Sequence, residues 1–249
     1  MSSTTNPLLE AKGITKYFGT ITALENVNLK VHAGECLGVV GDNGAGKSTL
    51  MKVLSGLYKP SAGSLFFQGK EEILESPRDS QNLGLEMVYQ DLALAGNLPI
   101  GENIFLGREP TKNLGFIKLL DFNKIKELTN AHLDKLKINV KSADQIVEEL
   151  SGGQRQAVAI ARSTAFNAKV VIMDEPTAAL AIKEVGKVLD LINSLKKTGV
   201  GVIVISHRMD DIFTVCDRVM ALFQGTNFAE ASLSNTSRDE VIGWIMGKK

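Results

Sequence analysis

A glycine-rich segment that lies between a strand pattern and a helix pattern constrains the fold of this chain more than any other feature. The segment runs from Gly41 to Ser48 with the spacing GxxxxGK followed by serine, and it comes directly after the apolar run Cys36 to Val40. Beyond it, Leu50, Val53 and Leu54 recur at helical spacing. Glycines let successive backbone N–H groups turn inward around a phosphate without a Cβ clash, and the following helix presents its positive end. This order of elements predicts a phosphate-binding loop.

Lys47 and Ser48 carry the chemistry that is expected of such a loop. The lysine should reach the β and γ phosphates of a nucleoside triphosphate, and the serine hydroxyl should bind Mg²⁺. An ordinary glycine-rich turn with a stray lysine is the alternative, but the strand before the loop and the helix after it argue against that interpretation. The residues expected to bind the nucleotide here are Gly41, Asp42, Asn43, Gly44, Ala45, Gly46, Lys47, Ser48 and Thr49.

Polar side chains follow each of the other core strands that the sequence predicts. Short runs rich in Val and Ile, typical of buried strands, occur at Leu85–Tyr89, Val170–Met173 and Gly201–Ile205. They are followed by Gln90, by Asp174 and Glu175, and by Ser206 and His207. Ligands of open α/β sheets bind beyond the carboxyl ends of the strands, so these groups should converge with the glycine loop if the strands are parallel neighbours.

Two adjacent carboxylates end the strand at Val170–Met173. Asp174 is expected to interact with Mg²⁺, and Glu175 stands where it can polarise a water that attacks the γ-phosphate, which makes it the candidate general base. The pair could instead cap a helix, because Pro176 at a first helical turn is favourable. A phosphate loop in the same chain favours the catalytic interpretation.

The alternation of strands and helices predicts an α/β fold with a mostly parallel core sheet. Lys183 to Lys197 places apolar residues on one helical face, with Gly199 as a C-cap. The first thirty-odd residues predict a small antiparallel sheet, and from about residue 97 to 165 the strand signal vanishes and helical patterning dominates. We therefore predict one domain over residues 1–249, with a core from about 1–96 and 166–249 and a helical insert at about 97–165.

Composition and simple sequence patterns limit which partners and which cellular compartment are expected for this chain. Lys plus Arg and Asp plus Glu are balanced at 28 each, which argues against nucleic acid as the main partner. No apolar run reaches the roughly 18 residues of a membrane span, and the N-terminal residues lack the pattern of a signal peptide. Cys36 and Cys216 have no CxxC spacing and are predicted to be buried free thiols in a reducing compartment.

Leu150 to Gln154 read LSGGQ, and together with the phosphate loop and the acidic strand end this segment resembles the signature of the ATP-binding cassette family. The resemblance covers essentially the whole chain and implies a P-loop NTPase fold that binds ATP and Mg²⁺. It implies that Phe18 stacks on adenine, with Tyr17 as the alternative. It further implies that Gln90 couples the γ-phosphate and Mg²⁺ to membrane subunits, and that His207 contacts the γ-phosphate.

The family also implies a head-to-tail dimer with a second copy of the chain. In that dimer Ser151, Gly152, Gly153 and Gln154 of one copy close over the phosphates that the other copy holds. A physical reason supports this arrangement, because a Ser-Gly-Gly segment ahead of a helix offers hydroxyl and N–H donors at a positive helix end.

Within the family, the chain most resembles the ATPases of importers for simple sugars such as ribose, xylose or fructose. The resembling stretches are Met87–Leu92, Glu102–Glu109, Glu148–Arg162 and Ile205–Ile212. The resemblance implies polytopic permease subunits as partners, indirect action with a sugar-binding protein, and a place at the cytoplasmic face of the cell membrane. One departure is Ala181, where most family members have an aspartate that helps to couple the two sites of the dimer.

Three other classes of protein remain as alternatives. A phosphoryl-transfer kinase would share the phosphate loop but would leave Leu150 to Gln154 without a role. A soluble cassette ATPase that is not linked to transport would normally show tandem cassettes, coiled coils or basic patches, and none stands out. A non-hydrolysing regulatory module would need a damaged site, whereas Lys47, Asp174, Glu175 and His207 are all in place.

Overall fold

The computed structural model describes residues 6–114 and 116–248. They belong to two compact units, of which the first combines the segments Met1–Gln90, Asn167–Pro176 and Ile192–Lys249. The second unit combines Asp91–Phe166 with Thr177–Leu191, so it takes in the predicted helical insert together with a later segment. No helix in the described part of the chain is long and apolar enough to cross a membrane.

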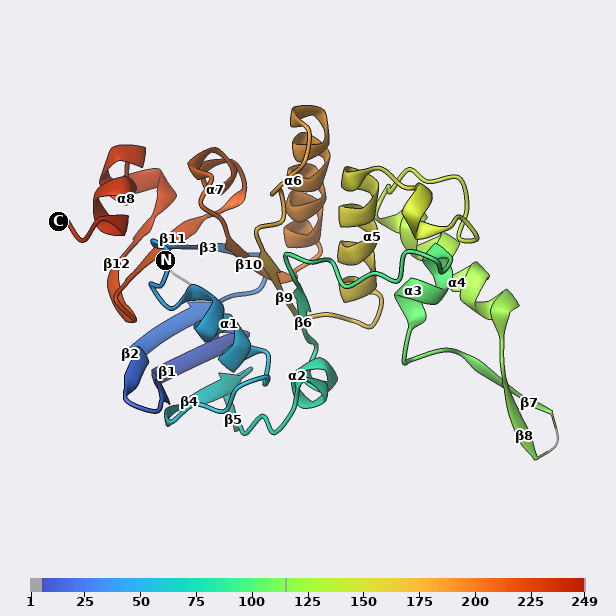
Figure 1. Ribbon diagram of the computed structural model, residues 1–249, viewed down its shortest axis with the longest axis horizontal. Helices are drawn as coiled ribbons and strands as arrows, with labels where there is room; N and C mark the ends of the chain where they lie inside the picture. Colours follow the sequence, from blue (N-terminus) through green and yellow to red (C-terminus); the bar gives the residue numbers. More distant parts are fainter. Residues whose placement is uncertain (1–5, 115, 249) are drawn as a thin grey trace. The chain divides into compact units, whose positions relative to one another are not determined.

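A six-stranded sheet forms the centre of the first unit (Figure 1). In spatial order its strands are β12 (Thr226–Ser232), β11 (Arg218–Phe223), β3 (Cys36–Val40), β10 (Gly201–Ile205), β9 (Val170–Asp174) and β6 (Leu85–Val88). All neighbouring strands are parallel except β11 and β12. The prediction of a mostly parallel core sheet is confirmed. Because β3, β6, β9 and β10 run in the same direction, the residues that follow them lie at one edge.

A second, antiparallel sheet of four strands belongs to the same unit. Its spatial order is β2 (Ile21–Val31), β1 (Leu9–Phe18), β4 (Ala62–Phe67) and β5 (Lys70–Glu72), which confirms the sheet expected near the N-terminus. Helix α1 (Lys47–Leu54) and both sheets contribute to one apolar core, in which Leu37, Leu50 and Leu65 are buried. This shared core fixes the loop before α1 between the two sheets.

The remaining helices of the first unit are α2 (Pro77–Leu83), α7 (Met209–Val215) and α8 (Arg238–Ile245). Helix α6 (Ile182–Lys197) begins in the second unit and ends in the first, and it agrees with the helix predicted over Lys183 to Lys197. Gly199 follows with φ +86° and donates its N–H to the Lys196 carbonyl, as expected of a C-cap.

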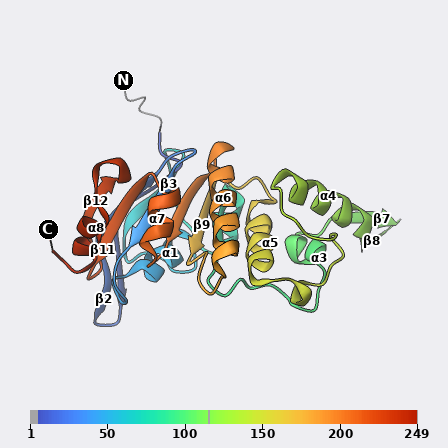
Figure 2. The same cartoon turned by 90° about the horizontal axis from the view of Figure 1, so that it is seen from above.

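The second unit contains α3 (Ile100–Phe105), α4 (Phe122–Lys135) and α5 (Gly152–Thr164) together with the first part of α6. Ile104, Ile125, Leu133 and Val158 are buried in the common core of α3, α4 and α5. Short 3-10 turns occur at Val147–Glu149 in this unit and at Leu233–Asn235 in the first. The two views, which are 90° apart, agree that α3, α4 and α5 pack together (Figure 2).

The second unit also contains a β-hairpin, β7 (Thr111–Leu114) and β8 (Ile117–Leu120), so the prediction that strands are absent from the insert is wrong here. The reason is that all eight strand residues are exposed. Without one buried face, the segment shows no alternation of apolar and polar residues, and the strand pattern cannot be recognised. In both views the hairpin projects beyond α3 and α4.

Cys36 and Cys216 lie close together in the first unit. Both thiols are free and buried, as predicted, and their Sγ atoms are 3.4 Å apart. The hydrogen bond with the Cys36 thiol, together with burial, raises the pKa of Cys216 well above its ordinary value. Cys36 begins β3 and Cys216 lies two residues before the neighbouring parallel strand β11, which explains their contact. Burial makes both thiols poor nucleophiles, and for Cys216 the raised pKa adds to this effect.

Candidate active site

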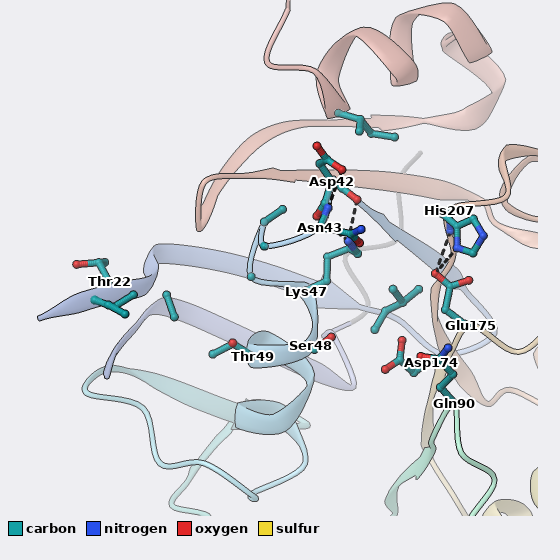
Figure 3. A pocket seen from close by; sticks show the side chains of 18 residues that line it. Thr22, Asp42, Asn43, Lys47, Ser48, Thr49, Gln90, Asp174, Glu175 and His207 are labelled. Atoms are coloured by element: carbon teal, nitrogen blue, oxygen red, sulfur yellow. Dashed lines mark hydrogen bonds and ion pairs between the residues drawn. The ribbon is translucent and has the colours of Figure 1, made fainter. Parts of the chain in front are cut away.

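A cavity of about 860 Å³ lies at the carboxyl edge of the core sheet, entirely within the first unit (Figure 3). Its size suits a nucleotide-sized ligand. The cavity is lined by Ile21, Thr22, Ala23, Gly41, Asp42, Asn43, Gly44, Ala45, Gly46, Lys47, Ser48, Thr49, Gln90, Asp174, Glu175, Ile205, His207 and Ile245. The structure thus brings together the whole predicted phosphate loop and four of the five polar residues predicted to follow β6, β9 and β10; the fifth, Ser206, is buried and does not line the cavity.

Glycine is required at two positions of the loop. Gly41 and Gly46 have φ of +154° and +99°, and an added Cβ would lie 2.5 Å from the Leu222 carbonyl oxygen and 2.8 Å from that of Ala23, respectively. Backbone atoms cannot withdraw as a flexible side chain can. The close approach of β11 and β2 to the loop therefore explains the glycines that the sequence pattern only suggested.

Alanine substitutions at Gly46 and Gly44 should separate the clash from the backbone strain. Gly44 also has positive φ, +80°, but an added Cβ there meets nothing within 4 Å. Each alanine costs about 1–3 kcal/mol of strain, and only Gly46→Ala adds a clash with backbone. We expect Gly46→Ala to unfold at a lower temperature than Gly44→Ala and to bind a fluorescent ATP analogue more weakly. If the two variants lost equally in unfolding temperature and in affinity for the analogue, the clash with backbone would add nothing to the effect of the strain.

Lys47 begins α1, with Gly46 as the N-cap residue. Its Nζ donates to the carbonyl oxygens of Gly41 and Asp42 at 2.7 and 2.9 Å, so the side chain lies along the loop. Burial lowers the pKa of Lys47, whereas the carboxylates of Glu175, Asp42 and Asp174 act in the opposite direction. The ammonium is thus a cation held among acidic groups, at the place where phosphates would enter.

The two carboxylates differ in their surroundings. Asp174 is the last residue of β9, and burial together with the neighbouring charge of Glu175 raises its pKa, while Lys47 lowers it. Glu175 has φ +50°, an unusual conformation for a non-glycine residue, and its N–H donates to the Ile205 carbonyl at 2.9 Å. Strained backbone of this kind is often kept where it aims a functional side chain.

Glu175 and His207 form a hydrogen-bonded pair (Figure 3). Oε1 of Glu175 accepts from the His207 backbone N–H at 3.2 Å and lies 2.8 Å from Nδ1 of the ring. A carboxylate only accepts, so Nδ1 carries the proton and Nε2 is left for another partner. Oε2 of Glu175 is buried and accepts no hydrogen bond from the described residues. A buried carboxylate oxygen without a donor suits the activation of a water molecule.

The oxygen-rich donor set suits Mg²⁺ that is shared with phosphates. Ser48, Gln90 and Asp174, the three predicted ligands, all line the cavity. Among the described residues no three Asp, Glu, His or Cys side chains cluster as a metal cage would require. Mg²⁺ prefers oxygen ligands and usually takes only one or two carboxylates together with substrate phosphates and water, so these residues fit it.

Phe18 lies outside the residues that line the cavity. Its side chain is 41% exposed, and its ring meets that of Tyr58 edge-on with 5.3 Å between the centroids. Stacking on adenine stays a prediction for Phe18, and Tyr17 beside it is 51% exposed. Sequence reasoning missed Ile21, which pairs with Phe18 across the tight β1–β2 turn. The turn signal at Gly19 could have identified Ile21, whereas nothing local marks Ile245.

The signature residues belong to the second unit, at the start of α5. Ser151 is the N-cap residue: its Oγ accepts from the Gln154 N–H at 3.3 Å, and Oε1 of Gln154 accepts from the Ser151 N–H at 3.0 Å. Gly152 and Gly153 are the first two residues of the helix. The sequence therefore makes a capping box here, which satisfies the Gln154 N–H and leaves the N–H groups of Gly152 and Gly153 without a partner inside the helix.

Ala181 is exposed and is the N-cap residue of α6, because its carbonyl accepts from the Val185 N–H at 3.1 Å. Alanine caps poorly, and serine or aspartate at this position typically stabilises by about 1 kcal/mol. We expect Ala181→Asp and the uncharged Ala181→Ser to raise the free energy of unfolding in urea and to keep ATP hydrolysis. A folded aspartate variant that hydrolyses almost nothing would show that this loop has diverged from the family geometry.

Comparison with known proteins identifies relatives for the whole chain. The family model described as ABC transporter matches residues 24–178. The xylose/arabinose import ATP-binding protein XylG of Sulfolobus acidocaldarius is 45% identical over 234 residues, 94% of this chain and 92% of the relative. The ribose import ATP-binding protein RbsA of Caldanaerobacter subterraneus subsp. tengcongensis is 40% identical over 98% of this chain, which spans only 48% of that relative.

Solved structures agree with the fold. A nucleotide-free ATP-binding cassette from an ABC transporter matches with a TM-score of 0.82 and 27% identity, covering 96% of this chain and 95% of the other. The dimeric structure of MJ0796, a bacterial ABC transporter cassette, matches with a TM-score of 0.74 and 27% identity, covering 90% of this chain and 98% of the other.

Proposed function

This chain belongs to the ABC transporter family, and we propose that it is the ATP-hydrolysing subunit of an importer for a simple sugar. One observation carries the proposal: Lys47, the adjacent pair Asp174 and Glu175, and His207, which come from three separate segments, line one cavity with the glycine loop. The names of XylG and RbsA, both sugar import ATP-binding proteins, support the substrate class.

The loop and Lys47 bind the triphosphate. Backbone N–H groups of Gly44 to Ser48 face the β-phosphate at the positive end of α1, and the Lys47 ammonium leaves the loop carbonyls for the β and γ oxygens. Ser48, Gln90 and Asp174 would hold Mg²⁺, which would supply positive charge to offset the charge of the phosphates. Phe18 stacks on the adenine.

Glu175 and His207 act on the γ-phosphate. Oε2 of Glu175 accepts a proton from the attacking water, while Oε1 keeps the His207 ring in place through Nδ1–H. Nε2 of the ring, when it bears a proton, donates to a γ-phosphate oxygen. The unpaired oxygen and the strained backbone at Glu175 support this assignment over a purely structural acidic pair.

A second copy of the chain completes the site in this proposal. Ser151 to Gln154 of one copy close over the γ-phosphate that the other copy holds, so two ATP molecules join the copies and hydrolysis separates them. The dimeric form of MJ0796 supports the arrangement. The chain lies peripherally at the cytoplasmic face of the membrane, where polytopic permease subunits convert closure into transport, and a sugar-binding protein acts with them as an indirect partner.

Two experiments test the proposed role in transport. The chain should co-purify with a polytopic permease, and in membrane vesicles sugar-loaded binding protein should stimulate its ATP hydrolysis. Hydrolysis without any membrane partner would favour the soluble ATPase, and transfer of phosphate to an acceptor would favour a kinase.

A mixing experiment tests the site shared between two copies. Mixing Ser151→Arg with Lys47→Ala subunits should leave one intact composite site in each heterodimer. Activity no higher than in either parent, with heterodimers present, would contradict it.

A further inference from the structure

The side chain of Glu184 lies over the two signature glycines in the second unit. An added Cβ on Gly153 would be 2.8 Å from Cβ of Glu184 and 2.9 Å from its Cγ and Cδ, and one on Gly152 would be 3.7 Å from its Oε2. Glu184 reaches this place from the first turn of α6. Gly153 is thus needed in part to make room for this side chain, whereas the 3.7 Å at Gly152 is an ordinary van der Waals contact.

The Glu184 carboxylate takes up hydrogen-bond donors of the signature loop. The Ser151 hydroxyl and the Gly153 N–H donate to it, and with the N–H of Ala181 they lower the pKa of Glu184. The carboxylate therefore lies at the N-termini of two helices, α5 and α6, where helix dipoles favour an anion. This contact is formed within one chain.

We propose that Glu184 is a positioning residue of the composite site: its carboxylate occupies the place on the signature loop that the γ-phosphate held by a second copy takes. The inference rests on the proposed function, because it needs closure between two copies. Ser151 and Gly153 cannot serve both anions at once, and a carboxylate beside a phosphate would add repulsion. Glu184 must therefore leave before the composite site closes.

The structure provides a place for the displaced side chain. Glu184 is partly exposed, and the charge of Lys187 on the same helix already acts on its carboxylate. Residues three apart on a helix can form an ion pair, so Lys187 can receive the carboxylate once Ser151 and Gly153 are taken. Before closure, the hydrogen bonds to Glu184 hold the signature loop in its shape. Because Glu184 competes with the γ-phosphate for these donors, a higher ATP concentration is needed for two copies to associate.

Association driven by ATP tests this in a chain whose hydrolysis is blocked by Glu175→Gln. Adding Glu184→Gln replaces the anion with a neutral, weaker competitor of the same shape. We expect ATP with Mg²⁺ to drive association at a roughly tenfold lower concentration of protein, as measured by sedimentation velocity. Glu149→Gln, an exposed carboxylate close to Ser151 in sequence, is the matched control for a general charge effect and should change little.

The outcomes separate the inference from its premise. If the Glu175→Gln parent stays monomeric with ATP, the composite site fails and the inference fails with it. If the parent associates and Glu184→Gln associates no more tightly, the inference alone is overturned. With active Glu175, Glu184→Gln should lower the half-saturating ATP concentration and leave kcat unchanged, which loss of a merely structural contact would not do. If the glutamine variant does not fold, Glu184→Asp is the substitute test. Its shorter side chain keeps the charge but reaches the signature loop less well, so it should also lower the protein concentration needed for association.

Discussion

Replacement of Glu175 by glutamine is expected to lower the rate of ATP hydrolysis by roughly 10² or more, the usual scale for a lost general base. The amide keeps an oxygen that can accept from the backbone N–H and the ring of His207, so the geometry should survive. What disappears is the proton acceptor at Oε2. Steady-state phosphate release measures the loss, and a titration with ATP should show that affinity is kept.

The same variant makes a prediction about its neighbour. The charge of Glu175 contributes to the raised pKa of Asp174, so in Glu175→Gln the pKa of Asp174 should fall toward its ordinary value. Because this repulsion destabilises the folded chain when both acids are ionised, the variant should unfold at no lower a temperature than the parent.

Glu127→Gln on α4, whose side chain is exposed, is the matched control for the loss of hydrolysis and should hydrolyse ATP normally. Normal hydrolysis in Glu175→Gln would assign the base elsewhere.

Replacement of Lys47 by alanine is expected to weaken ATP binding by roughly 10- to 100-fold. The variant loses hydrogen bonds from an ammonium to phosphate oxygens, worth about 1.5–3 kcal/mol each. It also leaves Asp174, Glu175 and the loop carbonyls of Gly41 and Asp42 facing the triphosphate without the cation that offsets them. Isothermal titration with ATP and Mg²⁺ measures the change.

Lys52 offers a matched control on the same helix. Its Nζ lies 5.5 Å from the centre of the Tyr58 ring, and it is not among the residues that line the cavity. Lys52→Ala removes the same charge from α1 and should leave the affinity for ATP within a few-fold of the parent. An unchanged affinity in Lys47→Ala, or equal losses in both variants, would contradict the role given to Lys47.

The sequence could predict the site wherever its chemistry is local. The phosphate loop needs a strand, a glycine segment and a helix in direct succession, and each is visible as a pattern of neighbouring residues. The same holds for Asp174 and Glu175, which follow an apolar run that is too short for a helix. Because the strands before these residues run parallel in one sheet, the phosphate loop, Asp174 and Glu175 were expected at one edge of the sheet. In the structure they all line one cavity.

Other features had no local signal. The hairpin at Thr111–Leu120 exposes both faces and so lacks a strand pattern, and the contact of Cys36 with Cys216 depends on the pairing of β3 with β11. Ile245 reaches the cavity only because α8 packs near the loop. The position of Phe18 against Tyr58 likewise depends on a neighbour that the sequence does not bring near.

By itself the sequence determined which groups bind phosphate, which carboxylates can act on it, and the family to which they belong, because these properties follow from residue type and short spacing. Only the tertiary structure decided how those groups are held: the clash that requires Gly46, the pairing of Glu175 with His207, and the seat of Glu184 on the signature glycines. Such contacts join residues far apart in the chain. Their energies depend on distance and burial, which no short stretch of sequence encodes.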